Sequence, residues 1–198
     1  MDKSGRRRLA VAVATALIAI AALASLATAE RESAAQLPAP TLAAGTCKNI
    51  DTPVRESTVR KLRKSVACLL KGERSRHARK PLASNKALQS AAQKHAKTMV
   101  ATNCLSHQCE GEVDLEARIR RSGYLDRATS WRYAENTGCG ISAEAMVANW
   151  MASKFHRLNI LDKGFKDVGV GVVQREVKGR CGDGYGAFVL VFGFRATR

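Results

Sequence analysis

The longest amphipathic pattern in the chain covers residues 142–161. Ser142 is a residue type that caps helices, and the apolar residues after it recur at intervals of three and four, as one face of a helix requires. These residues are Met146, Val147, Trp150 and Met151. The pattern ends in the polar pair His156 and Arg157, so it predicts a single buried helix that carries an imidazole to its own end.

Two strands are predicted after this helix. Residues 165–173 alternate around two glycines, in the pattern D-V-G-V-G-V-V from Asp167, which is typical of a half-buried strand that packs against the helix. The strongly apolar residues 185–194 predict a final strand. The segment 124–140 is a candidate for the start of another strand.

Three helices are predicted before this part of the chain. The first follows Pro53 over residues 56–74, the second covers residues 86–102 with Ser84 or Asn85 as its cap, and the third covers residues 114–122 and ends at Gly123. Four helices with short, antiparallel-type strands late in the chain favour an α+β domain, in which helices cover a small sheet on both faces.

The N-terminal residues have the pattern of an export signal. The first eight residues carry Lys3, Arg6, Arg7 and Arg8, residues 9–26 are almost wholly Ala, Leu, Ile and Val, and residues 27–29 form a small-x-small cleavage site. We predict a signal peptide over residues 1–29, with an uncleaved membrane anchor as the alternative. Residues 30–46 are predicted to be a flexible linker and residues 47–198 the folded domain. Either reading places the domain in the extracellular space or the cell envelope.

All six cysteines lie after the cleavage site, and an even number in an exported domain implies three disulfides. Position favours one pairing out of the 15 that six cysteines allow. The expected pairs are Cys47 with Cys68, Cys104 with Cys109, and Cys139 with Cys181. A zinc site is the competing reading, but C-x4-C around a histidine is poor zinc spacing.

The charge is strongly positive, with a formal net charge of +16 for the whole chain. Residues 1–29 hold four basic residues and one acidic residue, so the remainder keeps 29 basic and 16 acidic residues and a net charge of +13. Such a field attracts polyanions. No nucleic-acid motif accompanies it, so no specific nucleic acid is expected, and a solvated basic surface is the simplest interpretation.

Three polar residues are placed where they could converge on one site: His107, Glu135 and His156. Glu135 lies among aromatic residues and glycines, which predicts a carboxylate partly buried in a close-packed turn. His95 lies on an alanine-rich helix face, where a buried imidazole bonded to a loop carbonyl is a more common role than that of a ligand.

Several blocks of sequence, in order, resemble the CAP superfamily, named for cysteine-rich secretory proteins, antigen 5 and pathogenesis-related proteins, and in particular its bacterial exported branch (SCP-like domains). The blocks are A-A-Q-K-H-A-K-T-M from Ala91, S-H from Ser106, L-E-A-R-I-R-R-S-G-Y from Leu115, E-N-T from Glu135, A-M-V-A-N-W-M-A-S-K-F-H-R-L-N-I-L from Ala145 and F-K-D-V-G-V-G-V from Phe165.

The resemblance implies a three-layer α-β-α sandwich around a small antiparallel sheet, with a cleft whose positions fall on His107, Glu135 and His156. Ser153 stands where many eukaryotic members have a second glutamate. Ala134 replaces a usual glycine, and F-V-L from Phe188 replaces the W-T-Q of the last strand. These departures weaken any family-wide ligand assignment at the cleft.

Two histidines and a glutamate could hold a divalent metal such as zinc, although no cofactor is required by the pattern. No H-E-x-x-H pair and no G-x-S-x-G nucleophile is present, so enzyme activity is not favoured. The preferred hypothesis is a monomeric, non-catalytic domain that binds a small ligand or lipid, the ligand class that the resemblance suggests. The alternatives are a metal-dependent, peptidase-like hydrolase and a domain that binds an anionic cell-surface polymer through its basic face.

Overall fold

A computed structural model describes residues 47–197, and the predicted signal and linker lie outside the described residues. A four-stranded sheet forms the middle of this part of the chain, in the order β1-β3-β4-β2. β2 (Ala128–Gly140) and β3 (Asp167–Val173) both pair antiparallel with β4 (Gly186–Thr197). The two-residue β1 (Ala83–Ser84), which was not predicted, pairs in parallel with β3.

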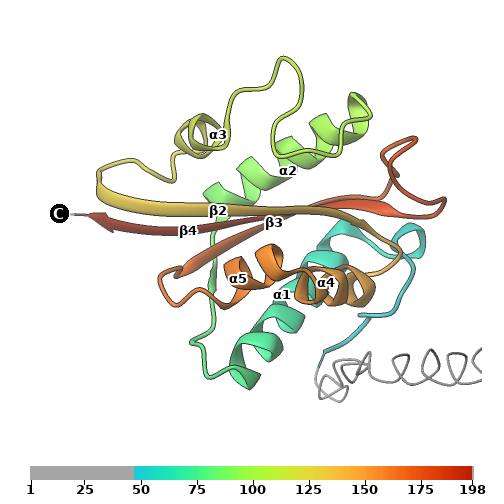
Figure 1. Ribbon diagram of the computed structural model, residues 1–198, viewed down its shortest axis with the longest axis horizontal. Coiled ribbons are helices and arrows are strands. Elements are labelled where there is room, and N and C mark those ends of the chain that lie inside the picture. Colours follow the sequence, from blue (N-terminus) through green and yellow to red (C-terminus); the bar gives the residue numbers. More distant parts are fainter. Residues whose placement is uncertain (1–46, 198) are drawn as a thin grey trace, which may run out of the picture. The chain divides into compact units, whose positions relative to one another are not determined.

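Helices cover both faces of the sheet, as Figure 1 shows. On one face lie α2 (Lys86–Ala101) and α3 (Leu115–Arg121). On the other lie α1 (Val59–Arg76), α4 (Ala143–Ala152) and α5 (Lys154–Leu161), and a short 3-10 turn, η1 (Val54–Glu56), precedes α1. The expected three-layer α+β sandwich is confirmed.

The strand pattern explains why two separate cores form. Along β4, Phe188, Leu190 and Phe192 belong to the core beneath α1, α4 and α5. Their neighbours Val189 and Val191 belong to the core beneath α2 and α3. Successive side chains of a strand point to opposite faces, so a continuous apolar run is what a strand between two helical layers requires.

Side-chain caps fix where the helices begin. The Asn85 side chain accepts hydrogen bonds from the first turn of α2, Asp114 accepts one from Ala117 N in α3, and Ser142 accepts one from Ala145 N in α4. Asn85 is one of the two caps that the sequence suggested. Each cap satisfies a backbone N–H that has no partner inside its own helix.

The prediction of one helix over residues 142–161 is wrong. Ser153 has an extended backbone (φ −81°, ψ 124°) that ends α4 and begins α5. Arg157 donates to the carbonyls of Met151 and Ala152 at 2.6 and 3.4 Å, which satisfies oxygens at the end of α4. His156 therefore lies in the first turn of α5 rather than at the end of a long helix.

Three disulfides join the predicted pairs: Cys47–Cys68, Cys104–Cys109 and Cys139–Cys181. The first ties the chain before α1 to that helix, the second closes the loop that holds His107, and the third joins the end of β2 to the loop before β4. No helix within residues 47–197 is both long and apolar enough to cross a membrane.

Candidate functional site

Glu135 lies within β2 rather than in the turn that was expected, and its residue surface is only 6% exposed. β2 is an outer strand of the sheet. The glycines that suggested a turn serve packing instead, because a Cβ on Gly138 would come within 2.6 Å of the Met146 side chain in α4. Strand geometry then sends Glu135 to one face and Asn136 to the other.

The Glu135 carboxylate is held by a histidine and an arginine. Its Oε1 lies 3.0 Å from His107 Nδ1, and its Oε2 accepts a hydrogen bond from Arg118 Nη1 at 2.8 Å. Arg118 also donates Nη2 to the carbonyl oxygen of His107 at 2.6 Å. Arg118 therefore fixes both the carboxylate and the loop that carries His107, and it supplies the counter-charge that a buried carboxylate needs.

A second histidine, His95 of α2, also lies beside the Glu135 carboxylate. The ring is fully buried, with Nε2 3.0 Å from the Ser106 carbonyl oxygen and Nδ1 2.7 Å from Glu112 Oε2. Its Nε2 is also 3.7 Å from Glu135 Oε1. The imidazole that lies beside Glu135 together with His107 is therefore His95, and it bonds a loop carbonyl as the sequence suggested. We call these five residues the carboxylate network: His95, His107, Glu112, Arg118 and Glu135.

His156 approaches from the opposite face of β2. Asn136 donates to the His156 carbonyl oxygen at 3.0 Å, and Asn159 donates to Asn136 Oδ1 at 2.9 Å, so α5 is anchored to the strand beside Glu135. Burial, followed by the charge of His107, lowers the pKa of the half-buried His156 ring. Ser153 lies one turn earlier, where its side chain makes no capping bond to α5.

Arg118, Glu112 and the position of His95 beside Glu135 were not found from the sequence. A signal was nevertheless present in the third helix, where Leu115, Arg118 and Ile119 share one face at helical spacing. An arginine on the inward face of a short helix has to meet a buried acid, because an unpaired charge is costly there. Glu112 had no comparable pattern around it.

The arrangement does not favour a metal ion at Glu135. Both oxygens of its carboxylate accept hydrogen bonds from Arg118, at 2.8 and 3.4 Å, and Oε1 also meets His107. A divalent ion bound by His107, His156 and Glu135 would compete with that guanidinium for the carboxylate. Among residues 47–197, no group of three or more His, Cys, Asp or Glu side chains is placed to hold a metal, and no cofactor is indicated.

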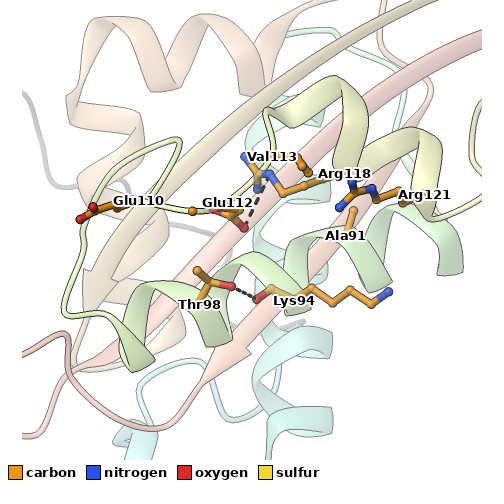
Figure 2. A pocket seen from close by; sticks show the side chains of 9 residues that line it. Ala91, Lys94, Thr98, Glu110, Glu112, Val113, Arg118 and Arg121 are labelled. Atoms are coloured by element: carbon orange, nitrogen blue, oxygen red, sulfur yellow. Dashed lines mark hydrogen bonds and ion pairs between the residues drawn. The ribbon is translucent and has the colours of Figure 1, made fainter.

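A pocket of about 370 Å³ adjoins the network between α2, α3 and the loop that joins them. Glu112 and Arg118 belong to both the network and the pocket wall (Figure 2). Ala91 and Val113 supply apolar surface, and the exposed cations Lys94 and Arg121 lie toward the same end of the pocket. Its volume is within the range of small-molecule sites.

We expect pH to act on the two site histidines in opposite directions. The hydrogen bond to Glu135 raises the pKa of His107 above 6.5, against an opposing effect of burial. Burial, followed by the charge of His107, lowers the pKa of His156 below 6.5. His107 thus adds stability that is present below pH 6.5 and lost as the pH rises through its raised pKa. His156 adds stability that is present above pH 6.5 and lost as the pH falls through its lowered pKa.

The free energy of unfolding in urea, measured from about pH 5 to about pH 8.5, checks this expectation. H107Q should flatten the decline on the alkaline side, and H156Q should flatten the decline on the acidic side. Wild-type pH profiles in both variants would show that neither ring titrates as its surroundings require.

Comparison with known proteins agrees with the fold. The family model of the cysteine-rich secretory protein family, CAP, matches residues 59–194. No curated protein matches the chain. An outer surface protein from Borrelia burgdorferi is 18% identical with a TM-score of 0.59, and the match covers 71% of this chain and 97% of that one. An extracellular protein with an SCP domain from Bacillus anthracis is 24% identical with a TM-score of 0.53.

The match to the Bacillus protein covers 69% of this chain and 43% of that one, so the resemblance spans less than half of the longer protein. At these identities the two structures show a shared fold. The family model covers well over half of the chain and includes every residue of the carboxylate network. The chain therefore belongs to the cysteine-rich secretory protein (CAP) family.

Proposed function

We propose that this protein is an exported, non-catalytic CAP domain that binds a small amphipathic anion, such as a fatty acid, in the pocket between α2 and α3. The observation that carries this proposal is the pocket of about 370 Å³ that shares Glu112 and Arg118 with the buried carboxylate network. Three disulfides among the described residues support export, because such bonds persist in oxidising compartments.

The role of the carboxylate network in this proposal is to hold the pocket wall in place. His95 and Arg118 together fix the loop after α2 through the carbonyls of Ser106 and His107. Gln108 also donates to the Glu112 carbonyl oxygen at 2.9 Å. A wall held by buried, charge-assisted bonds is pre-formed, so a ligand would lose little free energy in ordering it.

The pocket lining indicates the chemistry of the ligand. Lys94 and Arg121 form no ion pair within residues 47–197, and they present two cations at one end of the pocket. Glu110 lies at the other end and points away (Figure 2). Ala91, Val113 and the Thr98 side chain leave room for an apolar body between these ends. An acidic head with a hydrocarbon tail matches this distribution.

One observation favours a second candidate, the hydrolase. The His107 side chain is 61% exposed while its Nδ1 meets a buried carboxylate, which is the orientation of a histidine that serves as a general base. Arg118 already neutralises that carboxylate. In the peptidase-like form of this candidate, His107, Glu135 and His156 act with a metal such as zinc. Peptide hydrolysis therefore has to be measured alongside ligand affinity to distinguish the two functions.

Titration with a fluorescent long-chain fatty acid tests the proposal. Val113→Trp should fill the pocket and lower affinity more than tenfold, while Arg121→Gln should lower it about tenfold through loss of a charge-assisted contact. Arg120→Gln is the matched control, because Arg120 is on the same helix but does not line this pocket, and it should bind like wild type.

Mass spectrometry of protein purified from native membranes should find a bound lipid in the wild-type chain and not in Val113→Trp. Equal affinity in all three variants, with no lipid retained, would exclude the pocket as the site. Peptide hydrolysis that requires zinc and disappears in His156→Ala would place the hydrolase first.

A further inference from the structure

Three neighbouring hollows lie around the edge of the sheet opposite β2, where β1 and β3 are. One is formed by the start of the described chain and α1, the next by α1, β1, β3 and α2, and the third by α1 and α2. They have volumes of about 400, 270 and 290 Å³. The first two share Arg60 and Lys64, and the last two share Arg63 and Gln89, so they form one continuous surface.

Basic residues line all of this surface and no acidic residue lines any of it. We call it the basic track, and its cations are Lys48, Arg60, Lys61, Arg63, Lys64, Lys86, Lys94 and Lys97. Elsewhere on the described chain, cations such as Arg55, Arg120 and Arg132 are paired with carboxylates. None of the eight track residues forms an ion pair within residues 47–197.

The uncompensated charge of the basic track has to be balanced by mobile anions. A polyanion that replaces those small ions releases them to solution, which is a favourable entropic contribution to binding. Arg63 adds a partly desolvated cation at the centre of the track, where its Nη2 donates to Gln93 Oε1 at 2.5 Å. Gln93 is itself bonded to the backbone of Val172 in β3, so this cation is held in a fixed position.

The shape and composition of the track select among polyanions. The large exposed apolar side chains of the described residues, including Phe155 and Leu158 of α5, lie outside all three hollows, so the track lacks groups that insert into a membrane. No aromatic residue lines it, so there is no platform on which nucleic-acid bases could stack. Serine and glutamine side chains lie between the cations and can bond to spaced anionic groups.

We propose that the basic track binds a linear, flexible polyanion whose phosphate or carboxylate groups repeat along the chain, as in an anionic surface polymer. The polymer would pass from α1 across the edge of β3 to α2. This surface is separate from the pocket between α2 and α3 except at Lys94, which lines both. The two proposals therefore stand or fail independently.

Salt-dependent binding of the full chain to long-chain polyphosphate and to polygalacturonate tests this proposal. The track variant R60Q/K64Q/K97Q removes three exposed cations and leaves Lys94 in place. The control variant K154Q/K178Q/R180Q removes three exposed cations outside the hollows, so both variants have the same net charge. Thermal unfolding of both variants should match that of wild type, because all six side chains are at the surface.

We expect the track variant to lose at least about tenfold in affinity and to lower the slope of log K against log salt by about two, because each phosphate contact contributes about 0.7–0.9. The control should stay within about twofold of wild type. Tight binding of either polymer supports the proposal, and the tighter one identifies the anionic group.

If the track and control variants lost equal affinity for the polymers, binding would depend only on the net charge of the protein, and the proposal would be overturned. The proposal would also be overturned if vesicles containing anionic lipid, or duplex DNA, displaced polyphosphate when their concentration of negative charges was much lower than that of the polyphosphate. Those outcomes would assign the surface to a membrane or to nucleic acid.

Discussion

Replacing Gly171 with alanine is expected to cost about 3 kcal/mol or more of the free energy of unfolding. A Cβ at this position in β3 would lie 2.3 Å from the carbonyl oxygen of Ala92 and 2.7 Å from the amide nitrogen of Gln93, both in the backbone of α2. A side chain can rotate away from such a clash, but a helix backbone cannot. The whole helix would have to move away from the sheet, which opens gaps in the core that contains Leu88, Ala92 and Met99.

Urea unfolding of Gly171→Ala measures this cost, and Gly182→Ala is the control. A Cβ on Gly182 would meet only the Tyr185 ring at 3.2 Å, so that change should alter stability by less than about 1 kcal/mol. Because folded domains are stable by only about 5–15 kcal/mol, the Gly171 variant should unfold at much lower urea. Similar midpoints for the two variants would mean that α2 and β3 are not in close contact.

The strand that contains Gly171 illustrates what a sequence pattern can and cannot predict. Alternation of valine and glycine over residues 168–172 correctly predicted a strand, but the expected half-buried strand is wrong, because both faces of β3 are buried between helical layers. It did not show that Gly169 and Gly171 face α2 at backbone contact distance, because that depends on a helix some 80 residues earlier. Gly138 misled in the same way. In the local sequence it suggested a turn, but in the structure it allows β2 to pack closely against α4.

The division of residues 142–161 into two helices was hidden for a related reason. Periodicity continued through Ser153, and no proline or glycine marked a break. The break is stabilised by the bonds of Arg157 to the end of α4 and by the link between Asn159 and Asn136 of β2. These contacts become visible only when strand and helix are placed together. One consequence is the exposure of Phe155, at 76%, on the outer face of α5.

The candidate site was predictable where chemistry is concentrated in unusual residues. His107 and Glu135 were singled out together, and the structure places His107 Nδ1 3.0 Å from the carboxylate. Arginine was harder to identify in a chain with 33 basic residues, so Arg118 did not stand out although it makes the strongest contacts with Glu135. Basic composition concealed the one cation that the buried site requires.

Arg118→Met is expected to cost about 3–5 kcal/mol of the free energy of unfolding, because it leaves Glu135 buried without its partner. The Glu135 side chain is 1% exposed and the Arg118 side chain 6% exposed, so water cannot replace the lost guanidinium without local opening. The His107 carbonyl oxygen loses its donor in the same step. Arg120→Met in the same helix should cost about 0–1 kcal/mol, because its bond to Glu116 is at the surface.

A double-mutant cycle separates the ion pair from the packing of the methylene groups of Arg118. Glu135→Leu alone leaves the Arg118 cation buried and should also be costly, whereas Arg118→Met combined with Glu135→Leu removes both charges and replaces them with apolar groups. The double variant should therefore lose clearly less than the sum of the two single losses, since a buried pair exchanged for apolar residues is often nearly neutral. Hydrogen exchange in the loop of residues 104–112 should still increase in the double variant, because no donor then holds the His107 carbonyl. Additive losses would show that Arg118 and Glu135 contribute through packing alone, and the pocket wall would then need another explanation for its order.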